Sequence, residues 1–213
     1  MRRTRVKMCG ITRPEHARVA ARAGADAIGL MFYGPSPRYV TRARARAVCS
    51  ALPPLVSIVG GFVNPEPHEV EAVIEDLPVD LLQFHGEESP ELCATAGMPY
   101  MKAVRVRTRD DIVEAAARYT DARALLLDAH HDALWGGTGR QFDWSVVPDD
   151  VGRPIVLAGG LTPENVAGAI RLVRPFAVDV SGGVESAPGQ KDALSMERFM
   201  KEVASAETGE RQG

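Results

Sequence analysis

The chain has 213 residues, of which 45% are hydrophobic and 25% charged, as expected for one soluble globular domain. A net charge of −3 gives it no general attraction to nucleic acids or anionic membranes. Its three cysteines are widely spaced without a C-x-x-C pair, which argues against a disulfide framework or a structural zinc site. The basic N-terminus is not followed by an apolar run of signal-peptide or membrane-spanning length, so we expect a cytoplasmic protein.

Short apolar runs recur along the chain, and the segments between them have helical spacing. Near-continuous apolarity is typical of strands that are covered on both faces. In the last helical segment an apolar stripe at i, i+3, i+4 and i+7 indicates core packing. We predict strands at 5–9, 27–32, 55–63, 81–85, 101–106, 124–129, 154–159 and 177–181.

Several helix starts can be predicted from local chemistry. A small polar residue followed by proline and glutamate satisfies the free N–H groups and favours the positive end of the helix dipole. This pattern occurs at 64-NPE-66, 89-SPE-91 and 162-TPE-164, and Thr12 and Glu15 have capping-box spacing.

Eight strand–helix units leave two architectures, an open doubly wound sheet or a closed barrel, and the number matches barrel closure. We therefore predict a single-domain α/β fold, a (β/α)8 TIM barrel over residues 1–204, with a polar tail at 205–213.

Two glycine clusters follow the last two predicted strands, in 158-AGGLTPEN-165 and 181-SGGVES-186. In (β/α)8 barrels the active site lies at the carboxyl ends of the strands, and the loops after strands 7 and 8 often bind phosphate. Glycine allows close approach of backbone N–H groups to an anion. The alternative is that these glycines only form tight turns. We expect phosphate contacts from Gly159, Gly160, Ser181, Gly182 and Gly183.

Cys9 and Asp128 end apolar strands at the same predicted rim, where together they could form an acid/base pair. The alternative for Cys9 is structural, because a buried cysteine in a strand is normally only a small hydrophobe. Arg38, in a proline-stiffened loop, could hold a carboxylate through two hydrogen bonds, although loop arginines are usually only solvated. His85 either lines the pocket or hydrogen-bonds within the rim. We also expect substrate contacts from Gln83, His85 and Asp179.

The connection 130–144 is long and rich in glycine, which is typical of a lid. Gly137 and Gly139 could supply its hinges, and Arg140 could close on an anion. His130 and His131 are adjacent and no third ligand is evident, so we do not expect a metal site.

These segments resemble the phosphoribosylanthranilate isomerase family over nearly the whole chain. The resemblance implies an Amadori rearrangement of a phosphosugar in tryptophan biosynthesis, without metal or organic cofactor. It implies that Asp128 is the general acid, that Cys9 is the general base and that Arg38 holds the anthranilate carboxylate. The matching pieces are 7-KMCGIT-12, 36-SPRYV-40, 61-GFVN-64, 82-LQFHG-86, 126-LLDA-129, 136-GGTGRQFDW-144, 156-VLAGGLTPENV-166 and 177-AVDVSGGVE-185.

The chain departs from the family pattern at a few positions. Gly182 stands where the family usually has serine, Arg140 where it often has lysine, Gly61 where it often has a larger apolar residue, and Phe84 where leucine is common. One alternative is a histidine-pathway or dual-substrate phosphosugar isomerase barrel, which typically has aspartate at the position of Cys9. Another is a non-catalytic sugar-phosphate-binding barrel. As partner we expect only the small-molecule phosphosugar, with neither nucleic acid nor membrane, and a monomer or weak homodimer.

Overall fold

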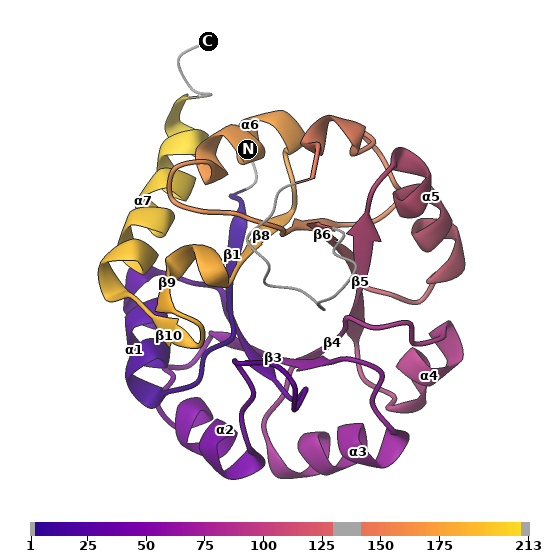
Figure 1. Cartoon of the computed structure of the whole chain (residues 1–213), viewed down its shortest axis with the longest axis vertical. Coiled ribbons are helices and arrows are strands. Elements are labelled where there is room, and N and C mark those ends of the chain that lie inside the picture. The colour runs from indigo at the N-terminus through magenta and orange to yellow at the C-terminus, as the bar shows by residue number, and fades with distance from the viewer. Residues whose placement is uncertain (1–2, 130–141, 210–213) are drawn as a thin grey trace.

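The computed structural model describes residues 3–129 and 142–209, and eight parallel strands form a closed barrel in it (Figure 1). Each strand pairs with its neighbour in chain order, and β1 pairs with β8 to close the ring. This is the predicted (β/α)8 architecture. The strands are β1 (Arg5–Cys9), β2 (Ala27–Met31), β3 (Ser57–Phe62), β4 (Leu81–Phe84), β5 (Tyr100–Val106), β6 (Ala124–Ala129), β7 (Ile155–Leu157) and β8 (Ala177–Val180).

Helices surround the barrel, as Figure 1 shows. They are α1 (Pro14–Ala23), α2 (Arg42–Cys49), α3 (Pro67–Asp76), α4 (Pro90–Thr95), α5 (Arg109–Arg118), α6 (Val166–Val173) and α7 (Ala193–Gly209). Between β6 and β7, the described residues contain only the short 3-10 helix η1 (Trp144–Val146). A second 3-10 helix, η2 (Gly182–Val184), and a small hairpin of β9 (Glu185–Ala187) and β10 (Gln190–Lys191) follow β8.

All eight predicted strands are present, but five are shorter than expected, and β3 and β7 are each shorter by three residues. β3 begins at Ser57 because the preceding Pro53-Pro54-Leu55 segment turns, with Leu55 at a φ of 70° and fully exposed. β7 ends at Leu157 because Gly159 and Gly160 both adopt positive φ, which extended strands do not allow.

Of the three predicted proline-containing helix starts, only one has the helix beginning at the predicted proline with the preceding residue as its cap. Ser89 caps α4 by accepting a hydrogen bond from the N–H of Leu92. α3 instead begins at Pro67 with a capping box between Glu66 and Glu69, because Asn64 has a left-handed φ of 46°. 162-TPE-164 precedes α6, which starts at Val166.

The capping box predicted at the first helix is wrong. Thr12 donates its hydroxyl to the carbonyl of Gly189, 177 residues away in sequence, at 2.8 Å, and α1 starts at Pro14 without a side-chain cap. A tertiary contact to the β9–β10 turn therefore replaces the expected local one.

Two apolar layers hold the barrel. Side chains such as Val59, Met101 and Leu126 fill its interior, and a larger cluster lies between the strands and the surrounding helices. Met196, Phe199 and Val203 of the predicted apolar stripe are buried in that outer layer. α7 continues beyond the expected boundary at 204 to Gly209, and Ala206 is buried, so the helix packs further than its polar sequence suggested.

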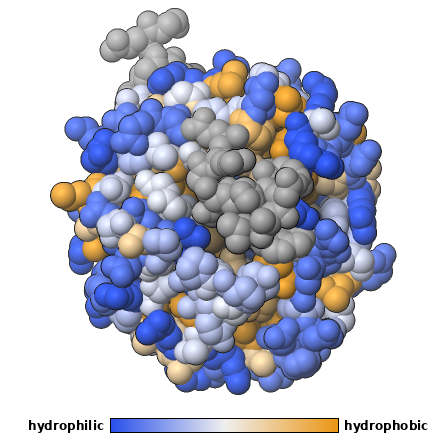
Figure 2. Space-filling view, in the orientation of Figure 1, coloured by the Kyte–Doolittle hydropathy of each residue, from blue (hydrophilic) through white to orange (hydrophobic). Residues whose placement is uncertain are grey.

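Polar residues dominate the face that Figure 2 shows, with apolar side chains only scattered among them. In the part of the chain that the structure describes, no helix combines the length and apolar character needed to span a bilayer.

Candidate active site

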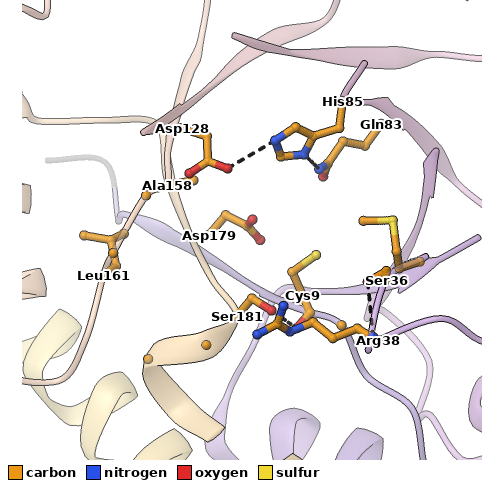
Figure 3. Close-up of a pocket in the computed structure, with 16 residues that line it drawn as sticks. Cys9, Ser36, Arg38, Gln83, His85, Asp128, Ala158, Leu161, Asp179 and Ser181 are labelled. Atoms are coloured by element: carbon orange, nitrogen blue, oxygen red, sulfur yellow. Dashed lines mark hydrogen bonds and ion pairs between the residues drawn. The ribbon is translucent and has the colours of Figure 1, made fainter. Parts of the chain in front are cut away.

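Residues from six of the strand ends meet in one pocket at the carboxyl end of the barrel (Figure 3). All the described residues that we predicted for the site line it. These are Cys9, Arg38, Gln83, His85, Asp128, Gly159, Gly160, Asp179, Ser181, Gly182 and Gly183. The three predicted lid residues, Gly137, Gly139 and Arg140, lie outside the described residues.

Cys9 ends β1 and points its thiol into the pocket from one side (Figure 3). Gly29 lies beside it on β2, and a Cβ there would stand 2.8 Å from the Cys9 Sγ, so glycine at this position makes room for the thiol. Burial raises the pKa of the Cys9 thiol, while the nearby Lys7 and Lys191 ammonium groups oppose that rise and Asp179 adds to it.

Asp128 ends β6 and forms a short hydrogen-bonded chain with two residues of the β4 end. Its Oδ2 lies 3.1 Å from Nε2 of His85, and Nδ1 of His85 lies 3.1 Å from Nε2 of Gln83. The other carboxyl oxygen accepts the N–H of Ala129 at 2.8 Å. All three side chains are buried. His85 thus both lines the pocket and hydrogen-bonds within the rim, which combines the two alternatives left open by the sequence.

Arg38 is already engaged in a two-pronged ion pair with Glu185. Its Nε and Nη2 donate to the two carboxylate oxygens of Glu185 at 2.9 and 2.7 Å. Lys191 binds the same carboxylate at 2.7 Å. The hydrogen bond to Glu185 raises the pKa of Arg38 and lowers that of Glu185 against the effect of burial. A guanidinium has two such edges, so the Nη1–Nη2 edge of Arg38 stays available for a second carboxylate.

The two glycine loops pack directly against one another. A Cβ on Gly183 would stand 1.9 Å from the carbonyl oxygen of Leu161, so only glycine allows this approach. Asn165 holds the first loop by donating to the carbonyl of Gly160 at 2.9 Å. Within the described residues the N–H groups of Gly160, Gly182 and Gly183 donate to no other group. The loops therefore present free donors to one side of the pocket.

A model of the family described as N-(5'-phosphoribosyl)anthranilate isomerase matches residues 6–202. An enzyme of that name from Acidithiobacillus ferrooxidans is 54% identical over 199 residues, covering 93% of this chain and 97% of the relative. The chain belongs to the N-(5'-phosphoribosyl)anthranilate isomerase family. Another member, from Pseudomonas putida, is 53% identical and is covered over its full length, with 97% of this chain aligned.

Solved structures of the family share the fold of this chain. The isomerase from Thermotoga maritima superposes with a TM-score of 0.88 at 43% identity, covering 95% of this chain and 99% of that one. A second family structure, solved in complex with reduced 1-(o-carboxyphenylamino)-1-deoxyribulose 5-phosphate, has a TM-score of 0.85 at 42% identity, with 95% of this chain and 99% of that chain covered.

Five charged residues that support the site from beside the pocket were missed from the sequence. Lys7 donates to Asp179 at 2.8 Å, and Glu185 and Lys191 form the cluster around Arg38. Below the end of β4, Lys102 lies 3.1 Å from the buried Glu88 and donates to the carbonyl of Gly86, which anchors the loop after His85. A signal existed for the two strand lysines, because each interrupts an otherwise apolar run, in 5-RVKMC-9 and 101-MKAVRV-106.

Proposed function

We propose that this chain converts N-(5'-phosphoribosyl)anthranilate to 1-(2-carboxyphenylamino)-1-deoxyribulose 5-phosphate in tryptophan biosynthesis, by acid/base catalysis without a cofactor. The observation that carries the proposal is that a thiol and a carboxyl group line one pocket together with a pair of glycine loops and an arginine. The substrate has the complementary form, with a phosphate at one end, a carboxylate at the other and a pentose between them. The names of the relatives favour this reaction over the histidine-pathway alternative.

In this mechanism Asp128 is the general acid and Cys9 the general base. Asp128 donates a proton to the ribose ring oxygen while the C1–O bond breaks and the nitrogen lone pair forms a protonated Schiff base. The Cys9 thiolate removes the proton on C2, and the released electron pair forms the C1–C2 double bond of a neutral enolamine. The thiol then protonates C1, and the C2 hydroxyl proton returns to Asp128, so that both groups regain their starting states.

The chain of Gln83, His85 and Asp128 suits a carboxyl group that must carry and recover a proton. When Nε2 of His85 is the donor, it stabilises the Asp128 carboxylate. When the imidazole is the other tautomer and the Gln83 amide is flipped, Nδ1–H of His85 can donate to Oε1 of Gln83, which has no partner in the described part of the chain. Nε2 of His85 can then accept from a protonated Asp128. The neutral imidazole thus supports both protonation states of the acid.

The ends of the substrate have separate proposed contacts. The free backbone donors of Gly160, Gly182 and Gly183, with Gly159 and Ser181 beside them, would bind the phosphate. The open edge of Arg38 would bind the anthranilate carboxylate while Glu185 occupies the other edge. Gly182 in place of the usual serine removes one hydroxyl and leaves the backbone donors. Asp179, Gln83 and His85 line the sugar-binding part of the pocket.

Three further predictions concern the segment outside the described residues, the cellular location and the oligomeric state. We predict that Gly137, Gly139 and Arg140 act as a lid and that the enzyme works in the cytoplasm. We also predict a monomer or weak homodimer, which sedimentation at several concentrations would test. The isomerase from Thermotoga maritima, 41% identical to this chain, is described as dimeric, and a structure of monomers generated from it is known.

The function is tested by a fluorescence assay on freshly generated phosphoribosylanthranilate, run beside the aminoaldose substrate of the histidine pathway. Loss of anthranilate-type fluorescence with the first substrate and no turnover of the second is the expected result. Turnover of both would indicate a dual-substrate enzyme. Tight binding of the first substrate without turnover would favour a non-catalytic barrel and overturn the proposal.

A further inference from the structure

Lys7 is a buried cation for which the proposed mechanism has no role. It lies on β1 two residues before Cys9, its side chain is 5% exposed, and it is not among the residues that line the pocket. Its Nζ donates to Oδ1 of Asp179 at 2.8 Å. A lysine is rarely buried without a purpose, because desolvation of its charge is costly.

The Lys7 side chain lies beside the thiol of Cys9. Alternate residues of a strand share one face, so both side chains project to the barrel interior. A Cβ on Gly29 would stand 2.8 Å from the Cys9 Sγ and 3.1 Å from Cε of Lys7, so the two side chains converge on the same glycine. Figure 3 shows the sulfur of Cys9 and the carboxyl group of Asp179 projecting toward the same part of the pocket.

The charged groups around Cys9 form a balanced set. Lys7 on β1, Arg38 after β2 and Lys191 on β10 are cations that interact with the thiol, and Asp179 on β8 is a carboxylate that does so. Glu185 on β9 is shared between Arg38 and Lys191. With three cations and two carboxylates, this cluster has one excess positive charge while Cys9 is a thiol and becomes neutral once Cys9 is a thiolate.

Lys7 is distinguished from the other two cations by its partner. Arg38 and Lys191 share Glu185, whereas Lys7 divides its charge between Asp179 and the thiol. Burial is the largest effect on the Cys9 pKa and raises it, and the Lys7 charge is the largest effect that lowers it. Without Lys7 the pKa of the buried thiol would rise further, and less of the thiolate, the form that accepts a proton, would be present at a given pH.

We propose that Lys7 is a positioning residue that stabilises the Cys9 thiolate from beneath the pocket, and that Asp179, by pairing with Lys7, limits how much of that charge acts on the thiol. This proposal rests on the assignment of Cys9 as the base. The competing explanation is structural: the Lys7–Asp179 pair bridges β1 and β8 where the barrel closes, and it could serve that purpose alone.

The rate at which iodoacetamide alkylates Cys9, followed by mass spectrometry as a function of pH, tests the proposal without any turnover. Lys7→Met should raise the midpoint of the profile by about one pH unit and lower the alkylation rate at neutral pH about tenfold. Lys7→Arg should largely retain the wild-type midpoint. Asp179→Asn should lower the midpoint, because it removes the carboxylate that competes for Lys7.

The two substitutions should shift the midpoint of the alkylation profile in opposite directions, which separates the two explanations. If the Lys7–Asp179 pair were purely structural, both variants would be less stable and their midpoints would stay the same. Lys102→Met is the matched control, because Lys102 is also a buried lysine paired with a carboxylate, that of Glu88. This substitution should lower the melting temperature without changing the alkylation profile of Cys9. If Lys7→Met does not fold, the Asp179→Asn midpoint decides the question.

Unmoved midpoints in Lys7→Met and Asp179→Asn would overturn the proposal. Because alkylation reports the ionisation of the thiol directly, its result also stands apart from the proposed reaction. A shifted midpoint in a protein that does not turn over phosphoribosylanthranilate would leave the thiolate stabilisation in place and refute only the function.

Discussion

The two sides of the pocket are built from different chemistry. Around Cys9, at the β1 and β8 ends, lie ionised groups in close pairs, with Lys7 on Asp179 and both Arg38 and Lys191 on Glu185. Around Asp128, at the β4 and β6 ends, lies a hydrogen-bonded chain of an imidazole and an amide. In the proposed mechanism, this difference would allow one small cavity to contain both a base and an acid. Cations favour the anionic form of a thiol, whereas a neutral imidazole can accept a proton from a carboxyl group as readily as it can donate one.

Removing either reactive group should have the largest effect on turnover. We expect Cys9→Ala and Asp128→Asn each to lower kcat by at least about 10²-fold, the lower end for general acid/base groups. Steady-state assays on phosphoribosylanthranilate measure this. Cys49→Ala is the control, because Cys49 lies in α2 outside the pocket and should keep wild-type kcat. Unchanged turnover in Cys9→Ala would exclude the thiol as the base.

The next largest effect is expected for Arg38→Ala, which tests whether the ionic side of the pocket contributes to substrate binding rather than to the chemical step. Loss of a hydrogen-bonded charge contact typically costs about 1.5–3 kcal/mol, which corresponds to a KM roughly 10- to 150-fold higher. Calorimetry with product analogues that have or lack the anthranilate carboxylate measures the contact itself. Equal losses for both analogues would show that Arg38 does not bind the carboxylate.

The packing between the glycine loops gives a smaller effect. Gly183→Ala would force a methyl group against the Leu161 carbonyl, so we expect a loss of about 1–3 kcal/mol in unfolding free energy and weaker binding of inorganic phosphate. Gly168→Ala is the matched control, because Gly168 is in α6 with open space around it and should gain about 0.5–1 kcal/mol. Unaltered phosphate affinity in Gly183→Ala would argue against the loops as the phosphate site.

The smallest expected effect is on stability at alkaline pH and comes from Cys93. This cysteine is buried outside the pocket, away from the three cations that surround Cys9. Burial, aided by the Glu88 carboxylate, raises the pKa of Cys93 to about 12 from a reference of 9.0. Its contribution to stability is therefore complete below about pH 9 and is lost as the pH rises toward about 12. Urea unfolding at neutral and alkaline pH measures the slope, part of which comes from Tyr100, whose pKa burial also raises to about 12.

Cys93→Ala should reduce that alkaline slope and leave the remainder to Tyr100. A slope that is the same in Cys93→Ala and in the wild type would contradict the assignment. Iodoacetamide sharpens the contrast between the two buried cysteines, since Cys9 should be modified in the native protein and Cys93 should not.

The sequence predicted the architecture well because strand periodicity is local. Each of the eight apolar runs overlaps its strand, and the ends of six strands meet in one pocket at the carboxyl end of the barrel. Helix starts were less predictable, since Thr12 binds a distant carbonyl and Asn64 takes a left-handed φ, with its Oδ1 accepting the N–H of Glu87. The pairing of Arg38 with Glu185, 147 residues apart, depends on tertiary contacts that local patterns do not encode.

Because the barrel closes between β1 and β8, the surroundings of Cys9 are completed only when the last strand has been synthesised. Cys9 is among the first residues synthesised, yet Asp179, Glu185 and Lys191 belong to the last part of the chain. A nascent chain still lacking β8 carries a thiol whose ionisation is not yet set by these groups. The alkylation rate of Cys9 is therefore expected to change when the final strand docks and the thiol becomes buried among these groups, so that this rate would report completion of folding during translation.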